Sequence, residues 1–98
     1  MANINYVDYG VLDSASAAYS TQAQALFDIM TKLDSTNTDL AGGFKNETSD
    51  AFLNRYESEY KKNMQELGDA LESIAKFLTD YASQHREADE ASASRIRG

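Results

Sequence analysis

The sequence contains no cysteine, no proline and no tryptophan, and it has only 5 glycines among 98 residues. Without cysteine the chain can form neither a disulfide nor a thiolate metal site. Without proline, and with few glycines, little in it interrupts long helices, and the β-branched residues are too scattered to form the alternating runs of strands. These absences favour a single all-α domain over residues 1–98.

Positive charge is also scarce, because 9 lysines and arginines face 16 aspartates and glutamates and leave a net charge of −7. We therefore expect neither nucleic acid nor an anionic membrane surface as a partner, since both are bound through clustered basic side chains. No stretch reaches the roughly 20 apolar residues of a membrane span. The N-terminal MANINYVDYG has no basic region followed by an apolar core, so we expect no cleaved secretory signal peptide.

Residues for catalysis or cofactor binding are few. His85 is the single histidine, and the serines near it on a helix do not make an oriented catalytic set. His85 and Asp89 lie one helical turn apart, but two ligands alone make a weak metal site. The glycines at 42 and 43 are not followed by a lysine at the spacing of a phosphate-binding loop. We therefore predict a protein that is not an enzyme and that holds no cofactor or metal.

Two amphipathic helices account for most of the chain. Asp8 suits the N-cap of a first helix over about residues 9–37, and a second helix is predicted over about residues 47–91. The short polar end at residues 92–98 is expected to be a flexible tail. In the first helix the apolar positions are Leu12, Tyr19, Leu26 and Leu33, with Ala15, Gln22 and Ile29 following at a distance of three. In the second helix the line that repeats every seven residues is Leu53, Tyr60, Leu67, Ile74 and Tyr81.

The break between the helices is expected at residues 38–46. Paired glycines commonly interrupt helices, because each accepts backbone angles that other residues resist. The amide side chain of Asn46 can cap the free N–H groups at the start of the second helix. Three aromatic residues nearby are expected to cluster where the helices meet, which predicts an antiparallel hairpin with an aromatic bend. The residues of this bend motif are Gly42, Gly43, Phe44, Asn46, Phe52 and Tyr56.

The apolar face of the second helix is wider than one partner helix needs. Beside its main line runs a second one, through Tyr56, Ala70 and Phe77. A loosely amphipathic helix with incidental exposed aromatics is the alternative interpretation, but a lone hairpin of this size buries little surface. We predict that two hairpins pair into a four-helix bundle, as a homodimer or as a heterodimer with a paralogue. The predicted interface consists of Tyr56, Tyr60, Leu67, Leu71, Ile74 and Phe77.

The bend resembles that of the WXG superfamily, the small ESAT-like helical hairpins exported by type VII secretion systems. In that family a Trp-x-Gly bend is followed by an aromatic residue eight positions after the tryptophan and by another four later. Here Phe44 stands at the tryptophan position, Phe52 follows eight positions on, and Tyr56 four further. Asn46 replaces the glycine of the signature, so the bend is divergent. The chain length and the absence of a recognisable signal peptide also fit the family.

The resemblance implies a non-enzymatic protein that a type VII system secretes without cleaving a signal peptide, after a cytoplasmic stage. The secretion ATPase is then an expected partner. The family's export signal, Tyr-x-x-x-Asp or Glu near the end of the second helix, falls on His85 and Asp89, where the acid matches and the histidine does not. The alternatives are a cytoplasmic adaptor or chaperone for a larger LXG-type toxin and a plain coiled-coil module with no role in secretion.

Overall fold

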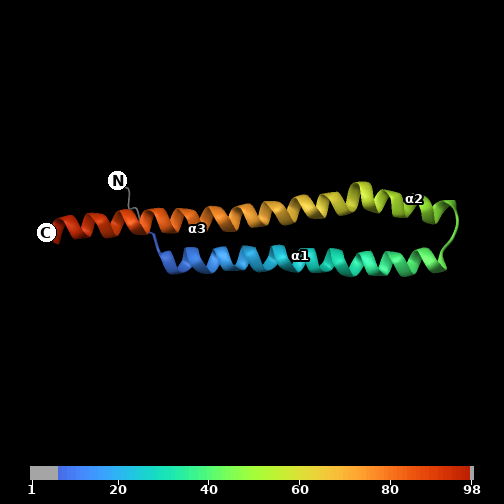
Figure 1. Cartoon of the computed structure of the whole chain (residues 1–98), viewed down its shortest axis with the longest axis horizontal. Helices are drawn as coiled ribbons and strands as arrows, with labels where there is room; N and C mark the ends of the chain where they lie inside the picture. The colour runs from blue at the N-terminus through green and yellow to red at the C-terminus, as the bar shows by residue number, and fades with distance from the viewer. Residues whose placement is uncertain (1–6, 98) are drawn as a thin grey trace, which may run out of the picture.

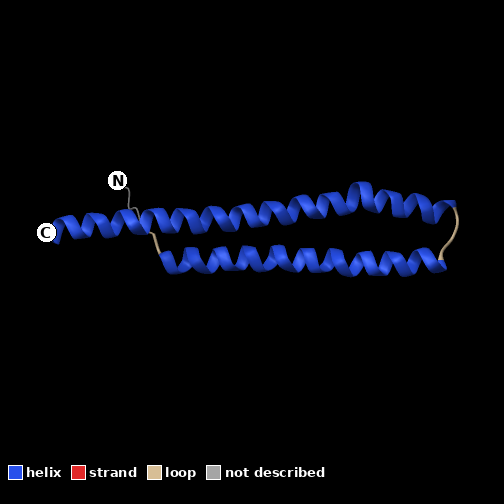
Figure 2. Ribbon diagram, in the orientation of Figure 1, coloured by secondary structure: helices blue, strands red, loops and turns tan. Residues whose placement is uncertain are grey.

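The computed structural model of this chain describes residues 7–97 and the side chains of residues 7–86. It consists of two long antiparallel arms joined by a short loop (Figures 1 and 2). The first arm is the single helix α1, Tyr9–Gly43. The second arm consists of α2 (Glu47–Arg55), a π-helical turn η1 (Tyr56–Tyr60) and α3 (Lys61–Arg97). The structure confirms the predicted all-α hairpin.

The first helix is longer than predicted. It continues to Gly43 instead of ending near residue 37, so the loop is confined to residues 44–46. Leu40 explains the extension, because it lies seven residues after Leu33 and is likewise half-buried against the second arm. Neither Gly42 nor Gly43 has a positive φ, so the paired glycines end the helix and do not form the turn.

The second arm is also more continuous than predicted. Its helix α3 extends to Arg97, beyond the predicted end near residue 91, so residues 92–97 of the predicted tail are helical, and Gly98 lies outside the described residues. The end of the chain is rich in alanine and arginine, which are strong helix formers, and it contains no proline. Local propensity therefore suffices to continue the helix there.

Both predicted helix caps are present. Asp8 Oδ1 accepts a hydrogen bond from the backbone N–H of Val11 at 3.1 Å, and Asn46 Oδ1 accepts one from the N–H of Ser49 at 2.9 Å. Ser49 is 1% exposed, and its hydroxyl donates to the backbone carbonyl of Phe44. Two side-chain hydrogen bonds, one accepted by Asn46 and one donated by Ser49, thus hold the loop against the first turn of α2.

A narrow seam of mostly small side chains holds the two arms together, and its buried positions recur every seven residues on both helices. Ser16 is its polar member: the hydroxyl donates to the backbone carbonyl of Ala75 at 2.8 Å and lies 2.6 Å from Oγ1 of Thr79. These bonds satisfy a buried hydroxyl and fix the two helices lengthwise. The hairpin seam comprises Ser16, Ala23 and Met30 of α1 with Gly68, Ala75 and Ala82 of α3.

The π-turn changes which residues of the second arm face this seam, and the arm bows outward from α1 there (Figure 1). Upstream, Leu53 is half-buried and Tyr56 buried in the seam. A regular α-helix would continue that pattern at Tyr60, Asn63, Leu67, Ala70 and Ile74. The structure instead places against α1 the residues Lys61, Met64, Gly68, Leu71 and Ala75, each one position later. A π-helical turn inserts one such extra residue, so the predicted unbroken seven-residue line from Leu53 to Tyr81 is wrong.

Gly68 lets the ring of Phe27 lie directly against the backbone of α3, because a Cβ built at Gly68 would lie 2.5 Å from Cε1 of that ring. We expect Gly68→Ala to lower the free energy of unfolding by about 1–2 kcal/mol. Overpacking of this kind costs about 1–3 kcal/mol, and the better helix propensity of alanine offsets up to about 1 kcal/mol of it. Urea unfolding followed by circular dichroism measures the change.

The matched control for this substitution is Gly42→Ala. A Cβ at Gly42 meets no atom within 4 Å, and the residue lies in the last turn of a helix. Its replacement should leave stability unchanged or raise it by up to about 1 kcal/mol. Equal stabilisation by both alanines would contradict the close contact between Gly68 and Phe27.

The hairpin is thin, with principal extents of 75 × 27 × 16 Å. Its radius of gyration is 22.0 Å, whereas a compact domain of this length has about 13 Å. Two helices side by side can bury only one stripe of each other, so much of both surfaces remains open to solvent or to a partner. None of the described helices is long and apolar enough to cross a membrane.

Candidate interaction surface

Large apolar side chains are exposed in a row along one flank of the second arm, from the end of η1 into α3. Tyr60, Leu67 and Ile74 recur every seven residues and are 41%, 54% and 39% exposed, and Phe77 beside them is 63% exposed. Leu71 lies between this row and the hairpin seam and is half-buried. Scattered exposed apolar residues are ordinary, but a contiguous row of them marks a contact surface.

The first helix adds apolar side chains to the same side. Tyr19, Gln22 and Ala18 of α1 line an open depression of about 190 Å³ together with Leu71 of α3. Ile29 follows Gln22 by seven residues, so it lies on that side too, and it is 48% exposed. Tyr19 and Ile29 belong to the apolar seven-residue pattern that predicted the first helix, and in that pattern the polar Gln22 was the one sign of an exposed line. The apolar face comprises Tyr19, Ile29, Tyr60, Leu67, Leu71, Ile74 and Phe77.

Polar contacts also join the two arms. Lys61 Nζ lies 3.1 Å from Asp34 Oδ2 and 3.7 Å from Glu57 Oε1, and the hydrogen bond to Asp34 raises the pKa of Lys61. Near the other end, Arg86 and Asp13 form an ion pair of 3.2 Å. Pairs as exposed as these add little stability, but they engage their charges within the chain. The flank of α3 away from the apolar row is polar, because the residues one position after the seam residues are the exposed Asp69, Lys76 and Ser83.

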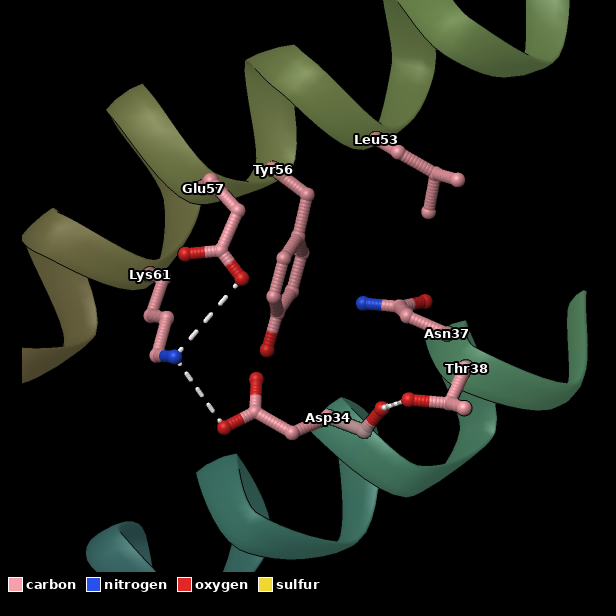
Figure 3. Close-up of a pocket in the computed structure, with 7 residues that line it drawn as sticks. All are labelled: Asp34, Asn37, Thr38, Leu53, Tyr56, Glu57 and Lys61. Carbon is pink, nitrogen blue, oxygen red and sulfur yellow. Dashed lines mark hydrogen bonds and ion pairs between the residues drawn. The ribbon is translucent and has the colours of Figure 1, made fainter. Parts of the chain in front are cut away.

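Tyr56 is buried, at 6% exposure, beside a pocket of about 400 Å³ between α1 and the π-turn (Figure 3). Its ring extends from the second arm toward Asp34, and neither its hydroxyl nor Asp34 Oδ1 has a hydrogen-bond partner. Burial, with the Asp34 carboxylate as a second cause, raises the pKa of Tyr56. Because Tyr56 faces α1 just ahead of the shift in register, the prediction that placed it in a dimer interface is wrong.

The predicted aromatic cluster at the bend does not form. Phe44 is 36% exposed and Phe52 43%, whereas Tyr56 is buried, and no ring contact among the described side chains joins these three. The seam at this end is filled by Ser49, Leu53 and Tyr56, which leaves Phe52 at its edge. The loss of a buried phenylalanine costs about 3–5 kcal/mol, so Phe44→Ala should cost less than that.

His85 is exposed, and its ring stacks on that of Tyr81 with the ring centroids 4.0 Å apart. The side chain of Asp89 lies outside the described residues, so the export pair stays a prediction. Within residues whose side chains are described, no group of three or more His, Cys, Asp or Glu could hold a metal ion.

Comparison with known proteins adds one positive finding. The family model WXG100, described as proteins of 100 residues with WXG, matches residues 6–90. No curated protein and no solved structure matches the chain significantly. The match covers α1, the loop where Phe44 and Asn46 replace the tryptophan and glycine, and the second arm as far as residue 90. Membership implies a small helical protein associated with type VII secretion. With a match of this extent and a fold to fit it, the chain belongs to the WXG100 family.

Proposed function

We propose that this chain is a non-enzymatic substrate or co-substrate of a type VII secretion system, and that it acts as a dimer through its helical surfaces. The observation that carries the proposal is the apolar face, which runs along both helices of the hairpin, whereas the other flank of α3 carries exposed polar residues. Proteins of this family typically form dimers. A second copy covering that face would complete a four-helix bundle with the exposed row of α3 in its core.

A second copy suits this face for two physical reasons. Dimers of identical chains are usually two-fold symmetric, so the same patch must pair with itself, and a row of apolar residues is self-complementary in this sense. Each chain also carries a net charge of −7, and the apolar face contains no ionisable group except tyrosine hydroxyls. The pairing therefore brings no carboxylates directly together.

Sedimentation equilibrium of the purified chain tests the assembly. We expect the mass of a homodimer at micromolar concentration. A well-folded monomer throughout that range would contradict the homodimer, and a stable one-to-one complex with a paralogue would establish the heterodimer instead.

Export is the second part of the proposal. We expect Asp89→Ala to abolish export from cells that carry the secretion system and to leave the melting temperature unchanged. The reason is that the secretion ATPase reads the acid in the His-x-x-x-Asp pair, whereas alanine is the best helix former and suits a position within α3. Glu72→Ala, at an exposed acid elsewhere on α3, is the control and should be exported normally. Wild-type export of Asp89→Ala would show that the signal lies elsewhere.

The second candidate function is that of a cytoplasmic adaptor for a larger LXG-type toxin. The divergent bend favours it, because Phe44 and Asn46 replace the family's tryptophan and glycine, and Phe44 and Phe52 are exposed at the tip. Co-expression with such a toxin separates the two functions. An adaptor would co-purify with the toxin and stay in the cell, whereas a substrate would appear in the medium without it.

A further inference from the structure

We infer that the π-turn at Tyr56–Tyr60 decides which of two apolar lines of α3 faces α1 and which is left for a partner. The turn thereby creates the apolar face to which we assign the proposed dimer. Which line of α3 faces α1 can be tested without any dimer. Only the claim that the other line binds a partner rests on the proposed function.

The two lines lie one residue apart along α3. The seam line carries small residues at Gly68, Ala75 and Ala82, and all three are buried. The second line carries large residues one position earlier, and those at Leu67 and Ile74 are 54% and 39% exposed. One residue corresponds to about 100° around an α-helix. If the π-turn were regular α-helix, α3 would be rotated by that angle and the large residues would face α1.

Contacts across the seam select the observed register. Gly68 accepts the ring of Phe27, which Leu67 would meet in a rotated helix. The hydroxyl of Ser16 bonds to the carbonyl of Ala75 at 2.8 Å, where a rotated helix would present Ile74. In that arrangement Ser16 would also lose its 2.6 Å contact with Thr79 and remain buried without a partner, which costs free energy.

Both ends of the π-turn are tied to α1 (Figure 3). Tyr56, its first residue, is buried beside Asp34. Lys61, the residue immediately after the turn, lies 3.1 Å from Asp34 Oδ2 and 3.7 Å from Glu57 Oε1 within the turn. The extra residue is therefore held between the buried ring of Tyr56 and the ion pair of Lys61 with Asp34. Single π-helical turns of this kind often lie at functional sites, and here the function is to orient the helix that follows.

Cysteine pairs test the register, because the chain has no cysteine of its own. Ser16→Cys with Thr79→Cys reports the observed register, since the two native oxygens are 2.6 Å apart. Ser16→Cys with Ile74→Cys reports the rotated one. Disulfide formation is strict in its geometry, so we expect the first pair to oxidise within the chain at least about tenfold faster than the second. Mass spectrometry of the protein after oxidation by glutathione measures both.

Deletion of Ser58 is the control for the cysteine experiment. It removes one residue from the π-turn, so even a regular helix would then place Thr79 opposite Ser16. The inference requires the disulfide between positions 16 and 79 to form in the full-length chain and in the deletion variant alike. A bond from position 16 to position 74 in the full-length chain that moves to position 79 on deletion would show a regular helix and overturn the inference.

The surface is tested in the chain that the disulfide between positions 16 and 79 locks. There Leu67→Asp should weaken dimerisation at least about tenfold in sedimentation equilibrium, because a carboxylate is costly to bury in an interface. Unchanged dimerisation would overturn the claim that this register presents the partner surface. A locked chain that stays monomeric even without Leu67→Asp would instead refute the proposed dimer, and with it the claim that the exposed line of α3 binds a partner.

Discussion

Tyr56→Ala should lower the free energy of unfolding of the hairpin by about 3–5 kcal/mol, the range measured when large buried aromatic side chains are truncated. Tyr56 is 6% exposed and lies between α1 and the π-turn, and Met30 is the one other large side chain that is buried among residues 7–86. Thin hairpins have little stability in reserve, so the variant should be largely unfolded at about 37 °C. Urea unfolding in the cold, where more of the variant stays folded, gives the size of the loss.

Tyr56→Phe is the matched control. It keeps the ring and removes a hydroxyl that has no hydrogen-bond partner, next to Asp34 Oδ1, which has none either. Removing a buried polar group without a partner relieves its desolvation cost, so this variant should be as stable as the wild type or more stable by up to about 1 kcal/mol. If Tyr56→Phe lost as much stability as Tyr56→Ala, the hydroxyl would have to make a bond that fixes the π-turn.

The same pair of proteins should differ in alkaline solution. The pKa of Tyr56 is raised above its ordinary value of 10.0, mainly by burial, so the folded chain keeps its phenol proton where the unfolded chain loses it. The folded state then binds more protons, and stability that is fully present below about pH 10 falls as the pH rises further. The wild type should lose more stability than Tyr56→Phe between about pH 9 and about pH 11. Parallel curves for both proteins would contradict the burial of the phenol.

The features that could be predicted from the sequence depend on residues close together in it. The caps at Asp8 and Asn46 each join a side chain to a backbone N–H three residues on, and both are present. The spacing of the apolar residues predicted the two helices, and the single break between them predicted the hairpin. The aromatic spacing after Phe44 led to the WXG resemblance, and the family is confirmed although its tryptophan and glycine are both replaced.

The features that could not be predicted depend on contacts between the arms. Counting in sevens assumes one constant helical period, and a π-turn breaks that assumption at one residue. The shift is stabilised by Phe27 against Gly68 and by Ser16 on Ala75, pairs that are far apart in sequence. The sequence did carry one sign of the observed register, because small residues stand at positions 68, 75 and 82, seven apart. Large residues one position earlier gave a stronger pattern, which led to the unbroken line from Leu53 to Tyr81 being predicted.

Leu67→Asp should weaken the proposed dimer about 100-fold or more, the second large effect that we expect. Leu67 is 54% exposed in the hairpin and central in the row of α3, so its replacement removes apolar area from the interface and buries a carboxylate there. A change of about 100-fold corresponds to about 2.8 kcal/mol, within the cost of burying an unpaired polar group. Adding Ile74→Asp should abolish the dimer at micromolar concentration. Sedimentation equilibrium measures the dissociation constants.

Ser83→Asp is the control, because it introduces the same charge on the other flank of α3. Ser83 follows the seam residue Ala82 by one position, whereas Leu67 precedes Gly68 by one, so the two sites lie on opposite sides of the seam. Circular dichroism should show wild-type helix content in both variants, since neither site is buried within the hairpin. If Leu67→Asp dimerised like the wild type and Ser83→Asp did not, the second copy would have to bind the polar side, and the apolar face would be free for a different partner.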